Sequence, residues 1–519
     1  MPHQFDARVG DKGVFDALLD AAHKFGPSKP ILEDQDRKPQ TYTDLIRAAF
    51  VLGRKIAHIT EPKERVGVLL PSSAGVVVTF YGLHAFGRVP VMLNFTSGVR
   101  NLKAALTAAG VKRILTARRF VEQGKLEDVV AELGKQAEIV WLDDFRKSIT
   151  LGDKLFGLAA GMAPKLFRTK TTGDDTGVIL FTSGSFGAPK GVLLTQKNLV
   201  ANVAQVAAHI DLDPSWVLFN PLPTFHCFGL TGGVLLPILT GMKAFMFPSP
   251  LLVKQIPPLI RDVKASILLA TDTFLNQYLR ASDPGDFDSL VFAVAGAEKV
   301  REETHNVFAE AYPHLPILEG YGATEAAPVV AVNKPDDNRR GTVGQMLPGM
   351  EWKLEPMDGI PVGGRLYLRG PNVMAGYLKP GSPDDLELLP DGWHDTGDIC
   401  DIDDDNYVRI LGRAKRFAKI GGEMVSLTAV ESFAEAVWPD GRHAVVSIPD
   451  DKKGERLVLV TDRPDAEVAS LAAWARSNGA PELAVPKKIM RVSELPVLGT
   501  GKTDYVAIQR MAEEQALAA

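Results

Sequence analysis

The chain has 519 residues, of which 45% are hydrophobic and 23% charged, and its formal net charge at pH 7 is −5. This is the composition of a soluble globular protein without the basic excess of a nucleic-acid-binding protein, so we exclude nucleic acid as a partner. The only two cysteines, Cys227 and Cys400, exclude a disulfide framework and a cysteine-rich metal site, and fit a reducing compartment.

Neither the N-terminus nor the interior predicts a targeting or membrane-spanning segment. The first residues lack the basic stretch and apolar run of a signal peptide. The longest apolar stretch, residues 228–239, is broken by glycines and a proline and is shorter than the roughly 20 residues that span a bilayer. We therefore expect a cytoplasmic protein and leave contact with a membrane surface open.

Short apolar runs alternate with helix-period segments along the chain. Residues 66–70, VGVLL, are typical of a buried strand, and an apolar helix is predicted over residues 76–86. The same rhythm recurs at residues 267–270 and 290–295. Strands that alternate with helices indicate an α/β fold whose parallel sheets are covered on both faces.

Residues 146–170 have a different pattern, with six basic residues and one acidic residue. Large apolar residues recur there at three- and four-residue steps, at Leu151, Leu155, Leu158, Met162 and Leu166. A helix with this pattern has an apolar stripe flanked by positive charge, although Gly157, Gly161 and Pro164 weaken it towards its end. Because most amphipathic helices face the core, we expect this one to pack on the protein's own sheet. Peripheral contact with the inner membrane surface is the alternative.

Residues 182–191, TSGSFGAPKG, join two apolar strands at residues 177–181 and 191–194. Glycines let the backbone approach an anion, and successive N–H groups and hydroxyls can surround it. A flexible hairpin would have a similar composition, so the loop alone indicates an anion site and no more. The candidate phosphate-binding residues are Thr182, Ser183, Gly184, Ser185, Gly187 and Lys190.

Two shorter motifs follow. Residues 223–229, PTFHCFG, place His226 after an apolar strand, where the alternative is a buried core histidine. Residues 295–298, AGAE, end a buried strand, at the edge where ligands of α/β sheets bind. Gly296, Ala297 and Glu298 are therefore candidate ligand-binding residues, with an ordinary strand-to-helix turn as the alternative.

Residues 319–325, EGYGATE, are the second motif that indicates a phosphate- or nucleotide-binding site. Gly320 and Gly322 allow close backbone approach, and Tyr321 offers a face on which a base can stack. Thr324 offers a hydroxyl to a phosphate, and Glu325 is a hard oxygen ligand of the kind that Mg²⁺ prefers. The first residue of the motif, Glu319, is included among the candidate nucleotide-binding residues.

The C-terminal part has its own strands and helices and predicts a small α+β domain. Before it, Asp398 in residues 393–398, WHDTGD, can accept the hydroxyls of a ribose, with an ordinary turn aspartate as the alternative, and Arg413 can donate to ribose or phosphate. Near the end, residues 499–503, GTGKT, look like the end of a P-loop. A P-loop needs glycine where Pro496 stands and a following helix early in a domain, so we exclude a P-loop enzyme.

Together these motifs resemble the adenylate-forming (AMP-binding) superfamily, and the resemblance spans nearly the whole chain. It implies ATP and Mg²⁺ as cofactors, with a large domain of stacked α/β subdomains (1–411), a hinge (412–415) and a small mobile domain (416–519). The residues implied to act in catalysis are Thr182, Lys190, His226 at the carboxylate channel, Glu325 as the Mg²⁺ ligand, and Lys502 as the adenylation lysine. Lys415 matches the hinge position, and Lys419, Gly421 and Gly422 match the face that serves the second step. Phe186 replaces a residue that is usually polar, so we expect one phosphate contact fewer.

A narrower resemblance is to the bacterial acyl-acyl carrier protein synthetases, which form the ligase portion of 2-acylglycerophosphoethanolamine acyltransferases. It is carried by residues 219–223, 270–274, 295–299, 412–425 and 498–505. It implies a medium- or long-chain fatty acid as substrate and the phosphopantetheine thiol of acyl carrier protein as acceptor. A fatty acyl-CoA synthetase is the first alternative, and a non-catalytic lipid- or carrier-binding protein on the same scaffold is the second.

Overall fold

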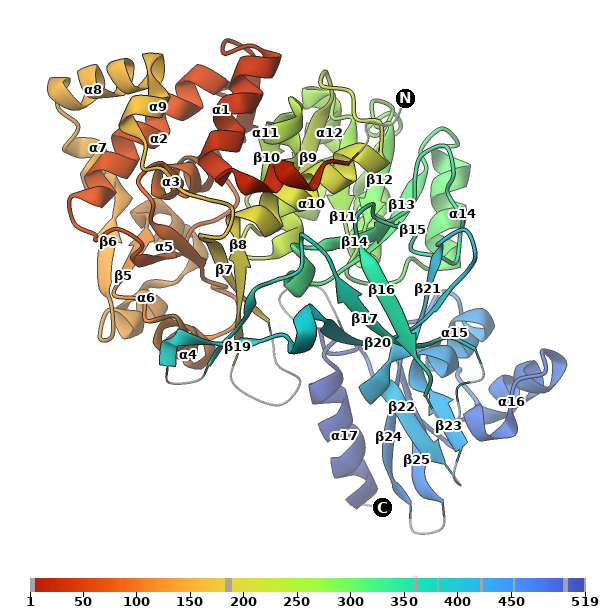
Figure 1. The fold of residues 1–519 in the computed structure, drawn as a ribbon. Coiled ribbons are helices and arrows are strands. Elements are labelled where there is room, and N and C mark those ends of the chain that lie inside the picture. Colours follow the sequence, from red (N-terminus) through yellow and green to blue (C-terminus); the bar gives the residue numbers. More distant parts are fainter. Residues whose placement is uncertain are drawn as a thin grey trace. The chain divides into compact units, whose positions relative to one another are not determined.

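The computed structural model describes residues 5–182, 189–357, 360, 362–379, 382–420, 423–450, 453–497 and 503–517 (Figure 1). The chain divides into two compact units. Unit 1 comprises Met1–Arg339, Met346–Met350 and Arg369–His394, and unit 2 comprises Arg340–Gln345, Glu351–Leu368 and Asp395–Ala519. In the described part of the chain, no helix is long and apolar enough to cross a membrane.

Unit 1 contains two large sheets. The first has eight strands, in the spatial order β19 (Ser382–Leu388), β18 (Gly376–Lys379), β8 (Lys190–Thr195), β7 (Thr176–Thr182), β4 (Val89–Met92), β3 (Arg65–Val68), β5 (Arg113–Thr116) and β6 (Glu138–Trp141). The strands from β7 to β6 are parallel, whereas β8, β18 and β19 extend the sheet by antiparallel pairing.

The second sheet has nine strands and is parallel from β1 to β13. Its spatial order is β15 (Gln345–Met346), β14 (Val329–Val332), β13 (Ile317–Gly322), β12 (Phe292–Ala295), β11 (Ile267–Ala270), β9 (Val217–Asn220), β10 (Lys243–Met246), β1 (Pro30–Asp34) and β2 (Gln40–Thr41). The predicted α/β fold with parallel sheets is confirmed.

A layer of helices lies between these sheets, and further helices cover their outer faces. The inner helices are α1 (Val14–Phe25), α2 (Tyr42–Ala57), α3 (Ala74–Ala85), α10 (Gln196–His209), the π-helix η2 (Phe228–Leu235) and α11 (Leu236–Thr240). Helices α4 (Val99–Ala109), α5 (Arg118–Gly124) and α6 (Glu127–Leu133) cover the first sheet, and α12 (Ile256–Val263), α13 (Asp272–Ala281) and α14 (Glu302–Ala311) cover the second. Because the strands are covered on both faces, their sequences are continuous apolar runs. Near β3, for example, Val66 and Val68 face the inner helices and Leu69 faces the outer ones.

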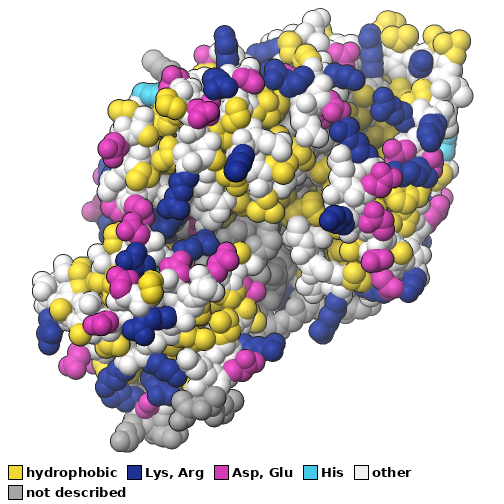
Figure 2. Space-filling view, turned by 180° about the vertical axis from the view of Figure 1, so that it is seen from behind, with side chains coloured by type: hydrophobic (Ala, Val, Ile, Leu, Met, Phe, Trp, Pro, Cys, Tyr) yellow, Lys and Arg dark blue, Asp and Glu magenta, His cyan; other side chains and the backbone are white. Residues whose placement is uncertain are grey.

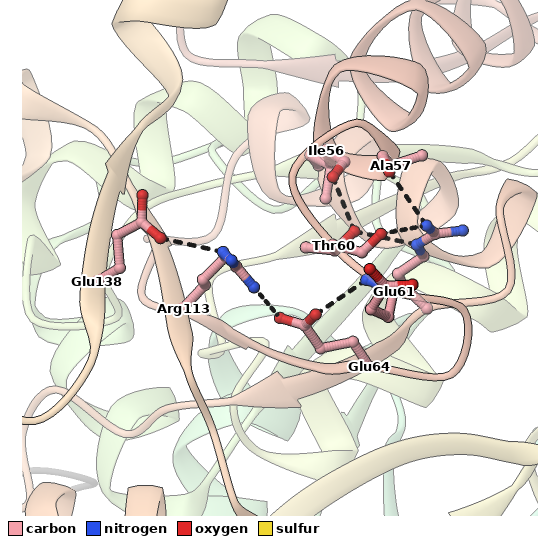
Figure 3. Close-up of polar contacts among 8 residues, drawn as sticks. Ile56, Ala57, Thr60, Glu61, Glu64, Arg113 and Glu138 are labelled. Atoms are coloured by element: carbon pink, nitrogen blue, oxygen red, sulfur yellow. Dashed lines mark hydrogen bonds and ion pairs between the residues drawn. The ribbon is translucent and has the colours of Figure 1, made fainter.

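Polar side chains tie the start of strand β3 to its neighbours (Figure 3). The guanidinium of Arg113 on β5 contacts Glu64 at 2.7 Å and Glu138 on β6 at 3.0 Å. The other carboxylate oxygen of Glu64 accepts a hydrogen bond from the backbone N–H of Glu61. Because one guanidinium bridges three consecutive segments of the sheet, it fixes their register at this end.

Helix α3 is apolar on every side, as expected for a helix enclosed between other elements. It carries His84, which is 1% exposed and packs its ring 4.5 Å from that of Phe80. Neither ring nitrogen has a hydrogen-bond partner within the described part of the chain. Burial therefore lowers the pKa of His84 to about 3.

This histidine should make unit 1 sensitive to acid. The unfolded chain binds a proton at His84 below about pH 6.5, but the folded chain does so only near pH 3, so stability falls as the pH drops between these values. We expect a loss of about 2 kcal/mol in the free energy of unfolding at pH 5 relative to pH 8. Urea denaturation at several pH values measures it, and His84→Leu should flatten the profile. The exposed His58→Leu serves as the control, and an unchanged acid limb in His84→Leu would contradict the assignment.

Residues 146–170 form α7 (Leu142–Lys147), α8 (Leu151–Met162) and α9 (Pro164–Phe167). The interpretation that the leucine stripe packs on the protein's own sheet is wrong. Leu151, Leu155, Leu158 and Met162 are exposed, and α8 instead packs the opposite face, around Gly157, on α2. The glycines that weaken the helix by propensity are the residues that allow it to pack.

Unit 2 contains two smaller sheets. The four-stranded sheet is β16 (Glu351–Glu355), β17 (Gly364–Arg369), β20 (His394–Ile402) and β21 (Val408–Arg413). The five-stranded sheet contains β22 (Phe417–Ile420), β23 (Glu423–Ser426), β24 (His443–Asp450), β25 (Gly454–Thr461) and β26 (Lys488–Arg491), with helices α15 (Leu427–Val437), α16 (Val468–Ser477) and α17 (Tyr505–Leu517). The predicted hinge at 412–415 coincides with the junction between these sheets, and its motion stays a prediction.

Candidate active site

The loop at residues 182–191 is the turn of the antiparallel hairpin β7–β8. Thr182 and Lys190 are paired across its base, Thr182 half-buried and Lys190 exposed. Residues 183–188 lie outside the described residues, and with them the predicted phosphate contacts of Ser183, Gly184, Ser185 and Gly187 and the substitution at Phe186. The hairpin therefore fixes where the loop begins and ends.

At this base, Lys190 is connected to Glu325 through Tyr377. The ammonium nitrogen of Lys190 lies 4.7 Å from the centroid of the Tyr377 ring, which is an attractive geometry for a cation. The Tyr377 hydroxyl donates a 2.7 Å hydrogen bond to Oε1 of Glu325. The Tyr377 side chain thus contacts the Lys190 ammonium with its ring and the Glu325 carboxylate with its hydroxyl.

The backbone around Glu325 is held by the residues that lead into β18, the strand that carries Tyr377. Glu325 lies in the 3₁₀ turn η4 (Thr324–Ala326), and its carbonyl accepts a 2.8 Å hydrogen bond from the N–H of Met374. The buried amide of Asn372 donates to the carbonyl of Ala326 at 2.7 Å. Tyr377 follows shortly and is paired with Val192 of β8, so one short segment positions both Glu325 and the lysine-bearing hairpin.

Neither Tyr377 nor Asn372 was identified from the sequence. Both lie in residues 370–379, which carry no motif of their own, and they reach the site because β18 adds to the edge of the hairpin. Tyr377 and Asn372 could be identified only by knowing that β18 pairs with β8, and a single sequence does not reveal this pairing.

The turn after β12 lies at the carboxyl end of the parallel strands. Gly296 is packed so closely that a Cβ there would lie 3.2 Å from the Phe228 ring. Ala297 has a φ of +73°, a left-handed conformation that is costly for a residue other than glycine and is found most often at functional sites. Glu298 accepts a hydrogen bond from the N–H of Thr273 at 2.8 Å, so its carboxylate caps the start of α13. Ala297 is exposed, so its left-handed backbone faces solvent.

The motif at residues 319–325 follows β13 and is also tightly packed. A Cβ on Gly322 would lie 2.3 Å from the carbonyl oxygen of Pro328, which explains the need for glycine. Tyr321 and Thr324 are half-buried, and Gly320 is paired with Val332 of β14. The motif thus brings a ring, a hydroxyl and the Glu325 carboxylate into one turn.

Glu319 has a different environment. Its side chain is 5% exposed and accepts hydrogen bonds from the N–H of Val300 at 3.0 Å and from His305 at 3.3 Å. These bonds fasten β13 to the start of α14. The carboxylate of Glu319 therefore has a structural role, and its predicted contact with a nucleotide stays a prediction.

The PTFHCFG motif leads into the π-helix η2, an irregular helix of a kind often found at functional sites. His226 is half-buried, with its ring centroid 5.5 Å from that of Phe225. Burial raises the pKa of the neighbouring Cys227 to about 12, and the charge of Glu325 adds to this effect. Because a thiol with this pKa stays protonated near neutral pH, Cys227 is excluded as a nucleophile.

In unit 2, Asp398 and Arg413 are directly paired across β20 and β21. The Asp398 side chain is 4% exposed, and its Oδ1 lies 2.7 Å from Nε of Arg413, whose own side chain is 64% exposed. The guanidinium thus fixes the carboxylate while leaving donors open to solvent. Lys415 follows in the short turn η6 (Ala414–Arg416), and the N–H of Lys419 donates to Glu455 at 2.6 Å. Gly421, Gly422 and Lys502 lie outside the described residues.

The predicted Mg²⁺ can be tested against this donor set. Glu325 provides one half-buried carboxylate, oriented by the Tyr377 hydroxyl. Mg²⁺ in nucleotide sites is held by one or two carboxylates together with phosphate oxygens and water, so a single carboxylate beside the lysine-bearing hairpin fits this ion.

Comparison with known proteins defines the class. Residues 19–378 match the family described as AMP-binding enzyme. The chain belongs to this family. The match includes the loop at 182–191, the Glu325 turn and all strands of the two large sheets except β19, and it ends within the strand that carries Tyr377.

Two relatives align over most of their length. The long-chain-fatty-acid–CoA ligase of Salmonella typhimurium is 28% identical over 479 residues, which are 85% of this chain and 84% of the relative. The medium-chain fatty-acid–CoA ligase of Escherichia coli K12 is 26% identical over 522 residues, which are 96% and 90% of the two chains.

Solved structures show the same fold. ATP-bound MatB from Rhodopseudomonas palustris superposes with a TM-score of 0.81 at 24% identity, covering 96% of this chain and 99% of that one. The Mycobacterium tuberculosis fatty acyl CoA synthetase gives a TM-score of 0.72 at 21% identity, with 98% and 100% covered. The predicted organisation, a large N-terminal and a small C-terminal α/β domain, is the organisation of this fold.

Proposed function

We propose that this protein activates a medium- or long-chain fatty acid with ATP, forms an acyl-adenylate with release of pyrophosphate, and transfers the acyl group to a thiol. The arrangement of Lys190, Tyr377 and Glu325 carries the proposal, because a cation and a carboxylate of the kind that Mg²⁺ prefers, joined through one tyrosine, support phosphate chemistry in an AMP-binding enzyme. The fatty acid is supported by the two aligned relatives, which are named as ligases of long- and medium-chain fatty acids.

The first step must bring a carboxylate against a polyphosphate. Two anions repel, and positive charge that is already in position lowers the barrier without reorganisation. Lys190 can provide such charge at the base of the loop, and the Glu325 carboxylate would hold Mg²⁺, which neutralises phosphate oxygens when bound. Tyr321 offers the adenine base a face for stacking. The Asp398 carboxylate can accept hydrogen bonds from the ribose hydroxyls, and the Arg413 guanidinium can donate to the ribose.

The second step needs a thiol that reaches the acyl-adenylate. Lys502, if it takes part in the first step, would obstruct that path. We propose that rotation at Lys415 presents Lys502 for adenylation and then the face that contains Lys419, Gly421 and Gly422 for thioester formation. The location of Lys415 between the two sheets of unit 2 is compatible with such a rotation.

Two acceptors are candidates. The names of the aligned relatives support CoA. Acyl carrier protein is supported by the narrower sequence resemblance and by exposed cations on the paired strands β25 and β26, since this acidic protein requires a basic docking surface. The exposed cations are Arg456 on β25, Lys453 just before β25 and Lys487 just before β26, and the half-buried Lys488 begins β26.

Two assays in sequence test the proposal. Exchange of pyrophosphate into ATP should depend on added fatty acid, and its absence would favour a non-catalytic lipid- or carrier-binding protein. Thioester formation should then be compared between free CoA and purified holo-acyl carrier protein at equal concentrations. A strong preference for one acceptor rejects the other.

Variants at Tyr377 test the arrangement at the loop. Tyr377→Phe keeps the ring beneath Lys190 but removes the hydrogen bond to Glu325, and a hydrogen bond to a charged group contributes about 1.5–3 kcal/mol. We expect adenylate formation to slow by roughly tenfold, since about 1.4 kcal/mol corresponds to a factor of ten. Tyr377→Leu removes both contacts and should slow it further. The matched control is Tyr367→Phe, which removes a tyrosine–glutamate hydrogen bond in unit 2, and equal losses in both Phe variants would contradict the role of Tyr377.

A further inference from the structure

The segment α7–α9, which connects the edge strand β6 to β7, exposes large apolar side chains to solvent. Figure 2 shows hydrophobic side chains beside dark blue basic ones at the corner of the molecule where these helices lie. The exposed residues and their exposed fractions are Leu151 (73%), Leu155 (57%), Leu158 (44%), Met162 (77%) and Leu166 (83%). We define these five residues as the leucine face. In α8 they recur every three or four positions, so they project from one side of the helix.

The leucine face is outside because the opposite side of α8 is built for close packing. A Cβ on Gly157 would lie 2.6 Å from Val51 of α2, and a Cβ on Gly161 would lie 2.7 Å from Arg47. Ala160, between them, is fully buried. Only small residues fit against α2 at this distance, so rotating the helix to bury the leucines would bring large side chains into occupied space.

Polar contacts fix α8 in this orientation. Thr150 and Asp153 form a capping box at its first turn, and the Asp153 carboxylate contacts the Lys55 ammonium of α2 at 2.8 Å. The hydrogen bond with Lys55, and then those from Thr150, hold the pKa of Asp153 well below its usual value. The side chain of Phe156 lies beneath Arg54, 4.4 Å from its guanidinium carbon. The exposed leucines therefore belong to a well-anchored helix.

The surroundings of the leucine face are positively charged. Residues 146–170 contain one acidic residue, Asp153, and Lys55 already neutralises it. The two acidic residues at the start of α7, Asp143 and Asp144, both contact Arg118. Arg168 is engaged with Asp16. Five further cations are exposed and form no ion pair with described residues, namely Arg146, Lys147, Lys154, Lys165 and Lys170.

From this arrangement we propose that the leucine face and its cations form a docking surface for an anionic lipid bilayer. An apolar stripe bordered by lysines is the pattern of a helix that lies in the membrane interface, with its large side chains among the acyl chains and its cations at the phosphates. A second copy of the chain fits less well, because a two-fold contact would place the same cations opposite one another. The bilayer also contains the acids that the proposed function consumes, although docking itself does not depend on that function.

Vesicle flotation without ATP or fatty acid tests the proposal. The protein should float with vesicles of phosphatidylcholine and phosphatidylglycerol at low salt, bind much less to pure phosphatidylcholine, and dissociate as salt is raised, because screening weakens the attraction. Leu155→Ser/Met162→Ser and Lys154→Glu/Lys165→Glu should each reduce the bound fraction at least tenfold. Because all four side chains are exposed, thermal unfolding should show that both variants fold.

The matched control is Leu251→Ser/Lys254→Glu, which changes an exposed leucine and an exposed lysine elsewhere in unit 1. It should bind vesicles as the wild type does. Failure of the wild type to float, or equal loss in the control, would overturn the proposal. So would light scattering that shows a wild-type dimer dissociating in the Leu155→Ser/Met162→Ser variant, since the leucine face would then be a protein interface. If vesicles bind but pyrophosphate exchange is absent, the docking surface stands and the proposed function does not.

Discussion

A Lys502→Ala variant should lose acyl-adenylate formation almost completely and still convert supplied acyl-adenylate to thioester. Removal of one positioned charge or donor that acts only in the transition state typically costs about 10²–10³ in rate, and we expect at least the lower figure. Thioester formation should remain within a few-fold of the wild type, because the second step is assigned to the face that contains Lys419. The two half-reactions are measured separately, by fatty-acid-dependent pyrophosphate exchange and by thioester formation from synthetic acyl-adenylate.

We expect the Lys502→Ala variant to stay folded, so that it reports on the side chain alone. Lys502 lies outside the described residues, but the chain is held on both sides of it: Val497 pairs with Thr503, and the N–H of Asp504 donates to the carbonyl of Pro496 at 2.9 Å. Removing the side chain should therefore leave unit 2 folded. Arg476→Ala, at an exposed arginine of the same unit, is the control for loss of a positive charge. Equal losses in both half-reactions of a folded Lys502→Ala protein would contradict the two-conformation assignment.

The sequence predicted the strands well where burial on both faces produces continuous apolar runs. The strand expected at 267–270 is β11, Ile267–Ala270, and those at 177–181 and 191–194 lie within β7 and β8. Periodicity failed at α8 for a physical reason. It locates an apolar stripe, but which face of a helix is packed depends on the partner, and here Val51 and Arg47 of α2 accept only glycines.

For the candidate site, the sequence indicates only those residues that lie within local motifs. Thr182, Lys190 and Glu325 come from stretches whose composition indicates phosphate chemistry, and the structure connects Lys190 to Glu325. The connecting residue, Tyr377, comes from a distant strand, and no pattern in a single sequence reports that pairing. The motif at 319–325 predicts a nucleotide contact for Glu319 but not the partners of its carboxylate, the N–H of Val300 and His305, which come from another segment.

In unit 2, the buried carboxylate of Glu431 connects the residue after the predicted hinge, Arg416, to the helix that follows Lys502. Arg416, directly after Lys415, contacts Glu431 of α15 at 2.5 Å, and its guanidinium carbon lies 3.7 Å from the ring centroid of Tyr505, the first residue of α17. The Tyr505 hydroxyl donates to the same carboxylate, which also accepts from the N–H of Val445. Burial raises the pKa of Glu431, and these partners offset the cost of its charge.

Glu431→Ala should therefore destabilise unit 2 strongly, because it removes the buried partner of the ion pair and leaves the half-buried Arg416 without its counter-charge. Removing one partner of a buried ion pair costs about 3–5 kcal/mol in the free energy of unfolding. Glu431→Gln should cost less, since its amide oxygen can still accept from Val445. Glu514→Ala, which removes the exposed ion pair with Arg510, is the control and should cost at most about 0.5 kcal/mol.

Hydrogen exchange resolved by peptide measures the effect, with faster exchange expected in α15 and α17 and unchanged exchange in unit 1. Both half-reactions should fall together in Glu431→Ala as its unit 2 unfolds, in contrast to Lys502→Ala, because Lys502 and Lys419 belong to the same unit. The two variants thus separate loss of one side chain from loss of the unit that presents it. If Glu431→Ala exchanged as slowly as Glu514→Ala, the Arg416 contact would not be what holds α15 and α17 together.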